Sequence, residues 1–361
     1  MKKNNYLSLG VMSGTSCDGI DLSLIQTDGK DRADFISSMY IKYSDELKED
    51  LFKLINNFTE SSLYSSKVIE IQEKVTIAFI NAIEKFYKKT SKRIDLISIH
   101  GQSIFHNPSK KISIQLCNAE LIKTKFNIKV VYDFRQNDIS NGGQGAPLTP
   151  IFHKLINKKF KLNGVNAYLN IGGVSNITLI RKNQIISAFD TGPGMGILND
   201  YVFFKKKIFY DKDGTDSMVG IVQHDIVKSL LKDKFFKLKP PKSLDKNYFD
   251  KTKFMNLKYN DSCASIVEFT VDAIKKGIFD NKFKIDNLIL MGGGIKNKCL
   301  FKRIKDKINI NIINIKSFGI DEDFIEAQAF AYLGVRRLKN LPLTYPQTTG
   351  VSKPVTGGKI I

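Results

Sequence analysis

The feature of this sequence that most constrains its fold is an order of elements that occurs twice. In each half, three apolar stretches of strand character follow one another across short polar or glycine-rich turns. A helix, a short buried strand ending in Gly, a second helix and another strand come next, with the glycine-ended strands at 95–101 and 286–294. Consecutive strands joined by short turns pair as a meander, and strands alternating with helices pair in parallel, so each half predicts one mixed α/β sheet.

Two similar halves predict an α/β protein of two lobes, each with a mixed sheet, that face each other across a central cleft. We expect an N-terminal lobe over residues 1–160, a C-terminal lobe over 161–340 and an irregular C-terminal tail over 341–361. The halves share the order of their elements and the chemistry of their turns, with negligible sequence identity. A lysine-rich insert at about 206–258 has no counterpart in the first half.

Composition excludes several classes of protein. The chain has 361 residues and no apolar run of about 18 residues, so we expect no membrane span. Its four cysteines are scattered without a Cys-x-x-Cys pair, which is typical of reduced thiols in a cytoplasmic protein. The formal net charge of +20 comes from lysines spread along the chain, without aromatic residues interleaved with Arg. We interpret this charge as a compositional bias and expect no nucleic-acid partner.

The nucleotide and metal motifs of fixed spacing are absent from the sequence. No Walker loop, H-E-x-x-H or G-x-S-x-G pattern occurs, and the four histidines lack metal-binding spacing. A turn of glycines and hydroxyl residues recurs instead at strand ends in both halves. Such turns bring backbone N–H groups close to a phosphate, and the hydroxyls add donors.

The first of these turns is SGTSCDGID, residues 13–21. Asp18 and Asp21 supply carboxylate oxygens, which Mg²⁺ prefers as ligands, directly or through water. The alternative is an ordinary β-hairpin, because Asp-Gly is a strong turn dipeptide. A hairpin accounts for Asp18-Gly19 but leaves the four small polar residues before them unexplained.

The second turn is FDTGPGMG, residues 189–196. We expect a strand to end at Phe189 and a helix to start near Pro193, since Pro is favoured in the first helical turn. The free N–H groups at that helix start would attract an anion. Asp190, at the strand end, is placed to act as a base or to bind a metal. The alternative is that Asp190 caps the helix.

Two further segments are candidates for ligand contacts. Three glycines in MGGGIKN, residues 291–297, would let a flat nucleobase lie against the backbone, although a close-packed strand–helix turn needs the same residues. The loop at 132–150 gathers four polar side chains, Asp133, Arg135, Asp138 and Gln144. The planar fork of an Arg suits a substrate carboxylate or phosphate.

Glycine turns at equivalent points of two α/β lobes are shared by sugar kinases, acetate kinase and actin. The sequence resembles one kinase family more closely, through eight blocks in family order from residue 8 to about 335. The blocks are GVMSGTSCDGID, HGQSIFHNP, DFRQNDISNGGQGAPLTPIFH, LNIGGVSNIT, FDTGPG, PPKSLDKNYF, GGGIKN and EAQAFAYLG. As a set they are similar to the anhydro-N-acetylmuramic acid kinases, which implies the two-lobed actin-like (ribonuclease H-like) fold.

The resemblance also implies an activity. An enzyme of this family opens 1,6-anhydro-N-acetylmuramic acid with water and phosphorylates the freed 6-oxygen from Mg-ATP, in the recycling of cell-wall peptidoglycan. The product is N-acetylmuramic acid 6-phosphate. The implied cofactors are ATP and Mg²⁺, the implied partner is this small sugar, and the implied form is a cytoplasmic homodimer.

Carried onto this chain, the resemblance makes Asp190 the catalytic base and residues 14–21 an ATP-binding segment. The full set of expected ATP contacts is Gly14, Thr15, Ser16, Cys17, Asp18, Gly19, Ile20, Asp21, Gly172, Gly173, Gly292, Gly293 and Gly294. The expected substrate contacts are Gln144, His100, Gly101 and Arg135, the last of which we assign to the lactyl carboxylate. Asp18 and Asp21 are the expected Mg²⁺ ligands.

Three positions depart from the family pattern, with Cys17 in place of Leu, Met195 in place of Asn and Asn199 in place of Asp. The last two put the positioning of Asp190 in question. Two alternatives to the assigned activity therefore stay open. One is a kinase of the same fold for another sugar or carboxylate acceptor, which the loop at 132–150 would distinguish. The other is a non-catalytic, ATP-binding regulator of the actin type.

Overall fold

The computed structural model describes residues 4–14 and 16–361 and divides the chain into two compact units. Unit 1 comprises Met1–Lys159 together with Asp323–Ile361, and unit 2 comprises Phe160–Glu322. The sequence predicts a C-terminal lobe over 161–340 and a separate tail over 341–361, and both boundaries need correction. The chain leaves unit 2 at Glu322, and all that follows belongs to unit 1.

Unit 1 is built on a sheet of seven strands. Its strands are β1 Tyr6–Ser13, β2 Gly19–Thr27, β3 Ala33–Lys42, β4 Leu96–Asn107, β5 Ile112–Leu116, β6 Lys129–Tyr132 and β12 Lys359–Ile360. The strand order is β12-β6-β4-β1-β2-β3, with β5 paired to β4. The helices of the unit are α1 Asp45–Asn57, α2 Ser66–Lys89, α3 Ala119–Phe126, α4 Gln136–Ser140, α5 Pro150–Lys159, α11 Ile325–Leu338 and α12 Pro346–Thr349.

Unit 2 is built on a sheet of five strands in the order β11-β10-β7-β8-β9. Its strands are β7 Val165–Ile171, β8 Val174–Arg181, β9 Gln184–Pro193, β10 Asn287–Met291 and β11 Asn311–Asn314. Its helices are α6 Gly196–Lys206, α7 Thr215–Val219, α8 His224–Leu230, α9 Tyr259–Phe279 and α10 Lys298–Lys307. Short 3₁₀ turns complete the chain at Glu60–Ser62, Pro108–Lys110, Lys212–Gly214, Lys234–Lys237, Thr252–Phe254, Gly293–Lys296, Ile315–Phe318 and Glu322–Phe324.

The two sheets repeat one topology. In unit 1, β1, β2 and β3 form an antiparallel meander, and β4 and β6 follow in parallel with β1. In unit 2, β7, β8 and β9 form the meander, and β10 and β11 follow in parallel with β7. The predicted α/β fold of two similar halves with mixed sheets, which sugar kinases and actin share, is confirmed.

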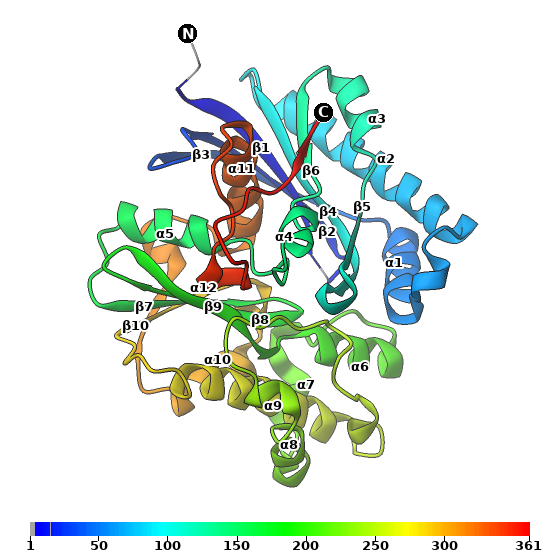
Figure 1. Ribbon diagram of the computed structural model, residues 1–361. Coiled ribbons are helices and arrows are strands. Elements are labelled where there is room, and N and C mark those ends of the chain that lie inside the picture. The colour runs from blue at the N-terminus through cyan, green and yellow to red at the C-terminus, as the bar shows by residue number, and fades with distance from the viewer. Residues whose placement is uncertain (1–3, 15) are drawn as a thin grey trace. The chain divides into compact units, whose positions relative to one another are not determined.

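Helix α11 explains why the chain returns to unit 1. It packs against β1, β2 and β4 of that unit, as Figure 1 shows for its orange ribbon. A Cβ on Gly10 of β1 would stand 1.8 Å from the carbonyl oxygen of Ala327, so only Gly allows this approach. Ser8 Oγ donates to the Ala331 carbonyl at 2.8 Å, which satisfies a hydroxyl buried beneath the helix. The small residues Ser8 and Gly10 in the buried strand β1 therefore allow α11 to pack closely on the sheet.

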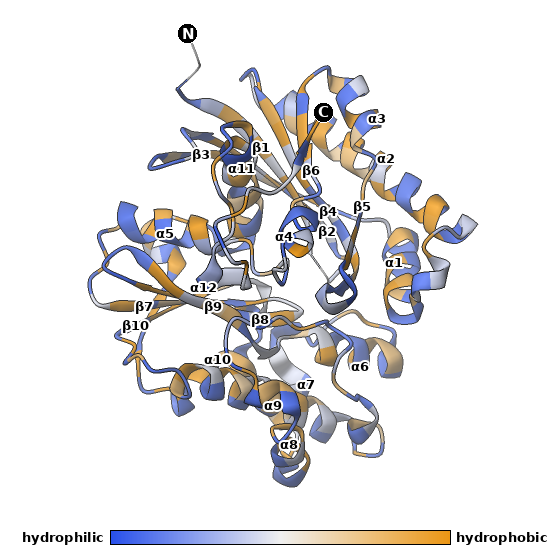
Figure 2. Cartoon of the chain, in the orientation of Figure 1, coloured by the Kyte–Doolittle hydropathy of each residue, from blue (hydrophilic) through white to orange (hydrophobic). Residues whose placement is uncertain are grey.

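The other face of the unit 1 sheet carries the main core of that unit. Figure 2 shows hydrophobic and hydrophilic residues interspersed along α2, and the buried ones recur at helical spacing. Val68, Ile71, Val75 and Phe79 are at most 4% exposed and join the buried side of β1, β2 and β4. The helix begins at Ser65, whose hydroxyl accepts from the backbone N–H of Val68. Amphipathic periodicity and a capping residue thus produce both the helix and its contact with the sheet.

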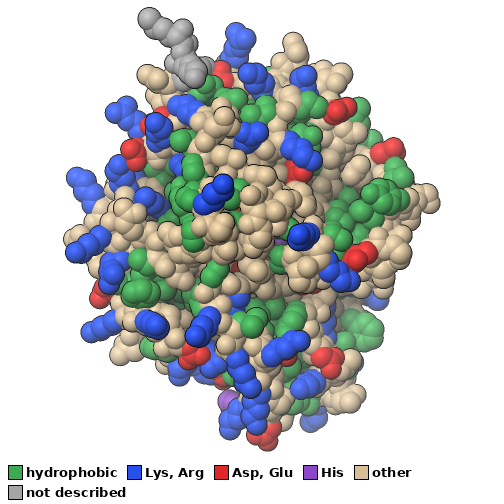
Figure 3. All heavy atoms as spheres, in the orientation of Figure 1, with side chains coloured by type: hydrophobic (Ala, Val, Ile, Leu, Met, Phe, Trp, Pro, Cys, Tyr) green, Lys and Arg blue, Asp and Glu red, His purple; other side chains and the backbone are tan. Residues whose placement is uncertain are grey.

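The surface shows no single basic stripe on the face drawn in Figure 3, where Lys and Arg side chains are scattered among the others. Within residues 4–14 and 16–361, none of the helices is both long enough and apolar enough to span a membrane.

Candidate active site

The turn at 13–21, which is predicted to contact phosphates and is named the first phosphate turn for that expectation, joins β1 to β2 in unit 1 and is tied to β4. Ser13 Oγ donates to Gln102 Oε1 at 2.6 Å and lies 2.8 Å from the carbonyl oxygen of Gly19. Gln102 Nε2 in turn donates to the Gly14 carbonyl at 3.0 Å, and the N–H of Cys17 reaches the same carbonyl at 3.2 Å. The turn is therefore closed by its own backbone and held from the neighbouring strand.

The side chains of this turn divide between the core and the surface. Cys17 is 1% exposed and Ile20 is completely buried, so their side chains belong to the core and only their backbone could contact a ligand. Ser16 is exposed and donates to Asp18 Oδ1 at 2.7 Å, while Asp18 and Asp21 are half-buried. Thr15, one of the expected ATP contacts, lies outside the described residues.

The fit of Mg²⁺ to this turn rests on the chemistry of its donors. Asp18 and Asp21 are hard oxygen donors on one hairpin, as a hard divalent ion requires. Across residues 4–14 and 16–361 no group of three or more His, Cys, Asp or Glu side chains gathers at one point. A magnesium ion here would rely on one or two carboxylates, completed by phosphate oxygens and water, which is its usual form in kinases.

Lys48 is a residue of this region that the sequence reasoning missed. It lies on α1, is 3% exposed and sits among the apolar residues of the buried helix face. Burial lowers the pKa of Lys48, and the negative charge of Asp18 acts in the opposite direction. A buried cation within electrostatic reach of Asp18 therefore belongs to the surroundings of the first phosphate turn.

The expected acceptor loop follows β6 and centres on Arg135. Arg135 Nε donates to His100 Nε2 at 3.0 Å, and its NH1 donates to the carbonyl of Gly145 at 2.8 Å. Because Nε2 of His100 accepts, the ring proton is on Nδ1, which lies 3.0 Å from the Gly101 carbonyl. Burial, followed by the charge of Arg135, holds the pKa of His100 well below its usual range. Two of the expected substrate contacts, Arg135 and His100, thus lie side by side, with a neutral His100 orienting the guanidinium.

Asp138 holds the rest of the acceptor loop in shape. It is 1% exposed, and its Oδ2 accepts from the N–H of Gly145 at 2.7 Å while Oδ1 accepts from Thr349 Oγ1 at 2.7 Å. The N–H of Gln144 donates to the Thr349 carbonyl at 2.7 Å, so this expected substrate contact is tied to the C-terminal segment through its backbone. Gly101 has a φ of 86° and marks the bend of β4 after His100. The segment expected to be an irregular tail thus braces the loop.

In unit 2 the turn that contains Gly172 and Gly173 is hydrogen-bonded to the turn FDTGPGMG. The N–H of Met195 donates to the Gly172 carbonyl at 2.7 Å, and those of Gly194 and Gly196 each donate to the Gly173 carbonyl at 3.0 Å. Pro193 ends β9, and α6 begins only at Gly196, so the expected helix start near Pro193 is wrong. The N–H groups engaged in this contact are those of Gly194 and Met195, which precede α6, and of Gly196, its first residue. The expectation that N–H groups of the first turn of this helix bind an anion stays a prediction.

Asp190 lies in β9 and is 5% exposed. Its Oδ2 accepts from the N–H of Leu244 at 2.7 Å, and its own N–H donates to the Lys242 carbonyl at 2.9 Å. Both partners come from the block PPKSLDKNYF, so this part of the lysine-rich insert positions the carboxylate. The alternative that Asp190 caps a helix is not what the structure shows, because α6 starts six residues later without a side-chain cap.

Lys242 adds a titratable cation beside Asp190. Burial lowers the pKa of Lys242 to about 8, and the negative charge of Asp190 works against that shift. Its Nζ donates to the Phe235 carbonyl at 3.0 Å and lies 4.3 Å from the centre of the Phe235 ring. The ammonium is therefore held in place rather than free to fold over the carboxylate.

The positions that depart from the family pattern do not hold Asp190 in this structure. Met195 precedes α6 and packs partly on the core, and Asn199 lies in the first turn of the helix. The neighbouring Asp200 is 7% exposed and accepts from Lys246 Nζ at 2.8 Å and also from Lys251 Nζ. Asp200 thus anchors the insert to α6, and the insert in turn carries the Leu244 N–H that contacts Asp190.

The three glycines after β10 have different roles. A Cβ on Gly292 would stand 2.4 Å from Asn170 Oδ1, and one on Gly294 would stand 2.5 Å from Ile171 Cγ2. These two glycines are needed for close packing on β7. A Cβ on Gly293 would meet no atom within 4 Å, so Gly293 is the one of the three with open space for a flat ligand.

Comparison with known proteins supplies the family. The family model described as anhydro-N-acetylmuramic acid kinase matches residues 6–361. An anhydro-N-acetylmuramic acid kinase of Pelagibacter ubique is 36% identical over 369 residues, covering 99% of this chain and 98% of that protein. Another of Methylorubrum populi is 36% identical over 369 residues, covering 98% of each.

Solved structures resemble this chain only distantly. An activator of 2-hydroxyisocaproyl-CoA dehydratase from Clostridium difficile with bound ADPNP is 12% identical, with a TM-score of 0.45 over 92% of this chain and 96% of that one. A glucokinase of the ROK family from Streptomyces griseus, in complex with glucose and AMPPNP, is 9% identical, with a TM-score of 0.41 over 90% and 97%.

Proposed function

This chain belongs to the family of anhydro-N-acetylmuramic acid kinases, and we propose that it converts 1,6-anhydro-N-acetylmuramic acid to N-acetylmuramic acid 6-phosphate with ATP. The observation that supports this proposal most is Asp190, a buried carboxylate whose Oδ2 is fixed by the Leu244 N–H within a chain that matches the family from residue 6 to its end. A base of fixed orientation is what the hydrolytic half of the reaction requires.

The proposed reaction joins a hydrolysis to a phosphoryl transfer. A water oxygen bonds to the anomeric carbon, the bond between that carbon and the bridging 6-oxygen breaks, and Asp190 takes the proton of the water. The released 6-oxygen bonds to the γ-phosphorus of ATP, and the bond from that phosphorus to the β-γ bridging oxygen breaks to release ADP. Phosphoryl transfer of this kind depends on positioning and charge neutralisation more than on covalent help from the protein. One carboxylate therefore suffices as the acid–base group.

We assign ATP to the glycine and hydroxyl turns and the sugar to the acceptor loop. In unit 1 the turn at 14–21 would contact the phosphates, and in unit 2 Gly293 offers open space for the base. Mg²⁺, when bound, neutralises phosphate charge, and Asp18 and Asp21 would hold it. Arg135, oriented by His100 and Gly145, would bind the lactyl carboxylate through its planar fork. A cytoplasmic homodimer that serves peptidoglycan recycling completes the proposal.

The test is an assay of the purified full chain with Mg-ATP and 1,6-anhydro-N-acetylmuramic acid, in which mass spectrometry identifies the sugar phosphate. We expect Asp190→Asn to lower kcat by about 10²–10⁴-fold, because it removes the base without changing the size of the side chain. Asp250→Asn, at an exposed carboxylate that bonds only nearby groups of its own turn, is the matched control and should leave kcat unchanged. A kcat for Asp190→Asn within tenfold of wild type would show that the base is another group. ATP binding without turnover would favour the regulator of the actin type.

A further inference from the structure

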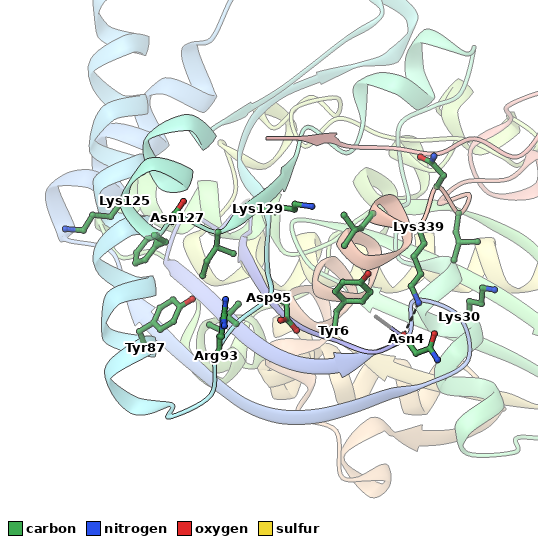
Figure 4. A pocket seen from close by; sticks show the side chains of 16 residues that line it. Asn4, Tyr6, Lys30, Tyr87, Arg93, Asp95, Lys125, Asn127, Lys129 and Lys339 are labelled. Atoms are coloured by element: carbon green, nitrogen blue, oxygen red, sulfur yellow. Dashed lines mark hydrogen bonds between the residues drawn. The ribbon is translucent and has the colours of Figure 1, made fainter. Parts of the chain in front are cut away.

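Unit 1 contains a basic pocket at the end of its sheet where the parallel strands begin. The pocket has a volume of 1110 Å³ and is lined by Tyr6 of β1, Asp95 just before β4, Lys129 of β6 and the ends of α3 and α11 (Figure 4). Because β1, β4 and β6 run in parallel, the phosphate turn and the acceptor loop of this unit follow their opposite ends. The pocket is therefore distinct from the active-site elements of unit 1, and it is large enough for a ligand of nucleotide size.

The lining of the pocket carries a large excess of positive charge. Its lining holds five basic side chains and one carboxylate, namely Lys30, Arg93, Lys125, Lys129, Lys339 and Asp95. Two of the cations are already paired. Lys339 Nζ donates to the carbonyls of Asn4 and Asp28 at 2.9 Å each, and Lys125 Nζ lies 2.9 Å from Glu84 Oε1. In the part of the chain that the structure describes, no ion pair or hydrogen bond engages the side chains of Lys30, Arg93 or Lys129.

Helix dipoles account for only part of this charge. Helices α2, α3 and α11 end in basic turns, and cations there offset the negative end of a helix. That effect fades within the last turn. Arg93 lies four residues beyond the end of α2, and Lys129 starts a strand three residues after α3 ends. Their presence at the pocket is thus not explained by the helices beside them.

A buried hydroxyl in the wall of the pocket is an independent sign of a missing acceptor. The Tyr87 hydroxyl is buried and has no hydrogen-bond partner among the described residues. Burial and the charge of Asp95 raise the pKa of Tyr87 to about 12, so the group carries its proton. The ring is fixed by stacking on Phe126, with centroids 5.7 Å apart and planes at 12°. A buried donor without an acceptor is costly unless a ligand or water supplies one.

We propose that this pocket binds a small phosphorylated metabolite, with its phosphate held by Arg93 and Lys129 and one phosphate oxygen accepting from the Tyr87 hydroxyl. Phosphate has enough acceptor oxygens for these three donors, and the fork of Arg93 matches two oxygens at once. Lys30 lies at the other end of the pocket, beside Lys339 (Figure 4). Lys339, fixed against Tyr6 at 5.5 Å from the ring centre, keeps that wall of the pocket positive and in place. The site is a second ligand site, separate from the one where phosphoryl transfer is proposed.

The test uses inorganic pyrophosphate as the probe and isothermal titration calorimetry at low salt. ADP is present at saturation, so that the phosphate turns of the active site are filled. We expect one pyrophosphate to bind each chain, and Arg93→Gln with Lys129→Gln to weaken that binding by about tenfold or more, because two charge-assisted contacts are lost. Tyr87→Phe should weaken it by about threefold, because a single neutral donor is lost.

The matched control removes two exposed lysines of unit 2, Lys275 and Lys302, by the same change to Gln. It lowers the net charge by the same amount and should leave pyrophosphate affinity at the wild-type value. Both double variants should keep the wild-type melting temperature and kcat, because neither pair lies in the catalytic machinery. Absence of pyrophosphate binding to the wild-type protein at millimolar concentration would overturn the proposal. Equal weakening in both double variants, or unchanged binding by Tyr87→Phe, would overturn it as well.

Discussion

At the scale of single residues, Lys48 is a charged side chain in an apolar position. It shares the buried face of α1 with Leu47, Leu51 and Ile55, and Asp18 of the phosphate turn acts on its charge. A buried ammonium costs stability unless a negative group compensates for it. The charge of Asp18 already acts in this sense, and the phosphates of ATP, where the turn binds them, would add to it.

We predict that Lys48→Met raises the KM for ATP or lowers kcat/KM by about tenfold or more, because a charge-assisted phosphate contact is lost. The melting temperature should stay the same or rise, since a buried charge is replaced by an apolar side chain of similar length. Steady-state kinetics and thermal unfolding give the two readouts. Lys53→Met, on the exposed side of the same helix, is the control. Unchanged kcat/KM for ATP in Lys48→Met would limit Lys48 to a structural role.

Lys242 gives a pH-dependent prediction. Its pKa is about 8 in the folded protein and near its ordinary value of 10.5 when unfolded, so between these values the unfolded chain binds more protons. Stability contributed by this group therefore rises with pH from about 8 to 10.5 and is lost as pH falls through 8. The melting temperature of Lys242→Met minus that of wild type should fall across this window. Scanning calorimetry from pH 7 to 10 measures it, and a difference as flat as that of the exposed Lys275→Met would contradict the assignment.

At the scale of elements, the seating of α11 on β1 has a direct test. We predict that Gly10→Ala destabilises the protein by about 3 kcal/mol, because the new methyl group would meet a helix carbonyl at 1.8 Å and the helix has to move. Denaturant unfolding measures the loss. Gly293→Ala adds the same methyl group where no atom lies within 4 Å and should leave stability within about 0.5 kcal/mol of wild type. Equal free energies of unfolding for both variants would show that α11 can shift away from β1 without loss of stability.

The elements also show what sequence reasoning captures and where it stops. Both meanders and the parallel strands after them were predictable, because apolar runs and turn residues are local signals. The assignment of α11 to the second lobe was wrong, because a helical pattern does not say which sheet it covers. The signal that could have corrected it is the presence of small residues in two buried strands, because they leave room for a closely packed helix. These residues are Ser8 and Gly10 in β1 and Ser98 in β4.

The candidate site was predictable to a similar extent. Asp190 and Arg135 were found because polar residues at strand ends stand out against apolar strands. Lys48 was missed because one more lysine in a lysine-rich helix carries no signal until its burial is known. The partners that hold the site, such as Leu244 for Asp190 and His100 for Arg135, come from distant parts of the chain, and only the folded structure shows which of them meet.

At the scale of the whole molecule, unit 2 is continuous in sequence and unit 1 is not. The core of unit 2 consists of residues between Val165 and Ile308, all within its own segment. We predict that residues 160–322 alone fold with a cooperative unfolding transition, because their apolar core is complete. Residues 1–322 should lack a folded unit 1, because the strand β12 and the helix α11 that covers the sheet are both missing. Circular dichroism and amide hydrogen exchange test both, and a non-cooperative 160–322 segment would contradict the division into units.

Because unit 1 is made of two segments separated by unit 2, its parts are synthesised at different times. Strands β1, β2 and β4 leave the ribosome early, but α11, which covers one face of them, is made after all of unit 2. At about 5–20 residues per second, the delay is roughly ten to fifty seconds. During that time the uncovered face of the sheet is accessible to chaperones and to other nascent chains. All residues of the unit 2 core, in contrast, have been translated by the time α11 is made. Residues 323–361 are thus translated after unit 2 and complete unit 1, whose translation begins before that of unit 2.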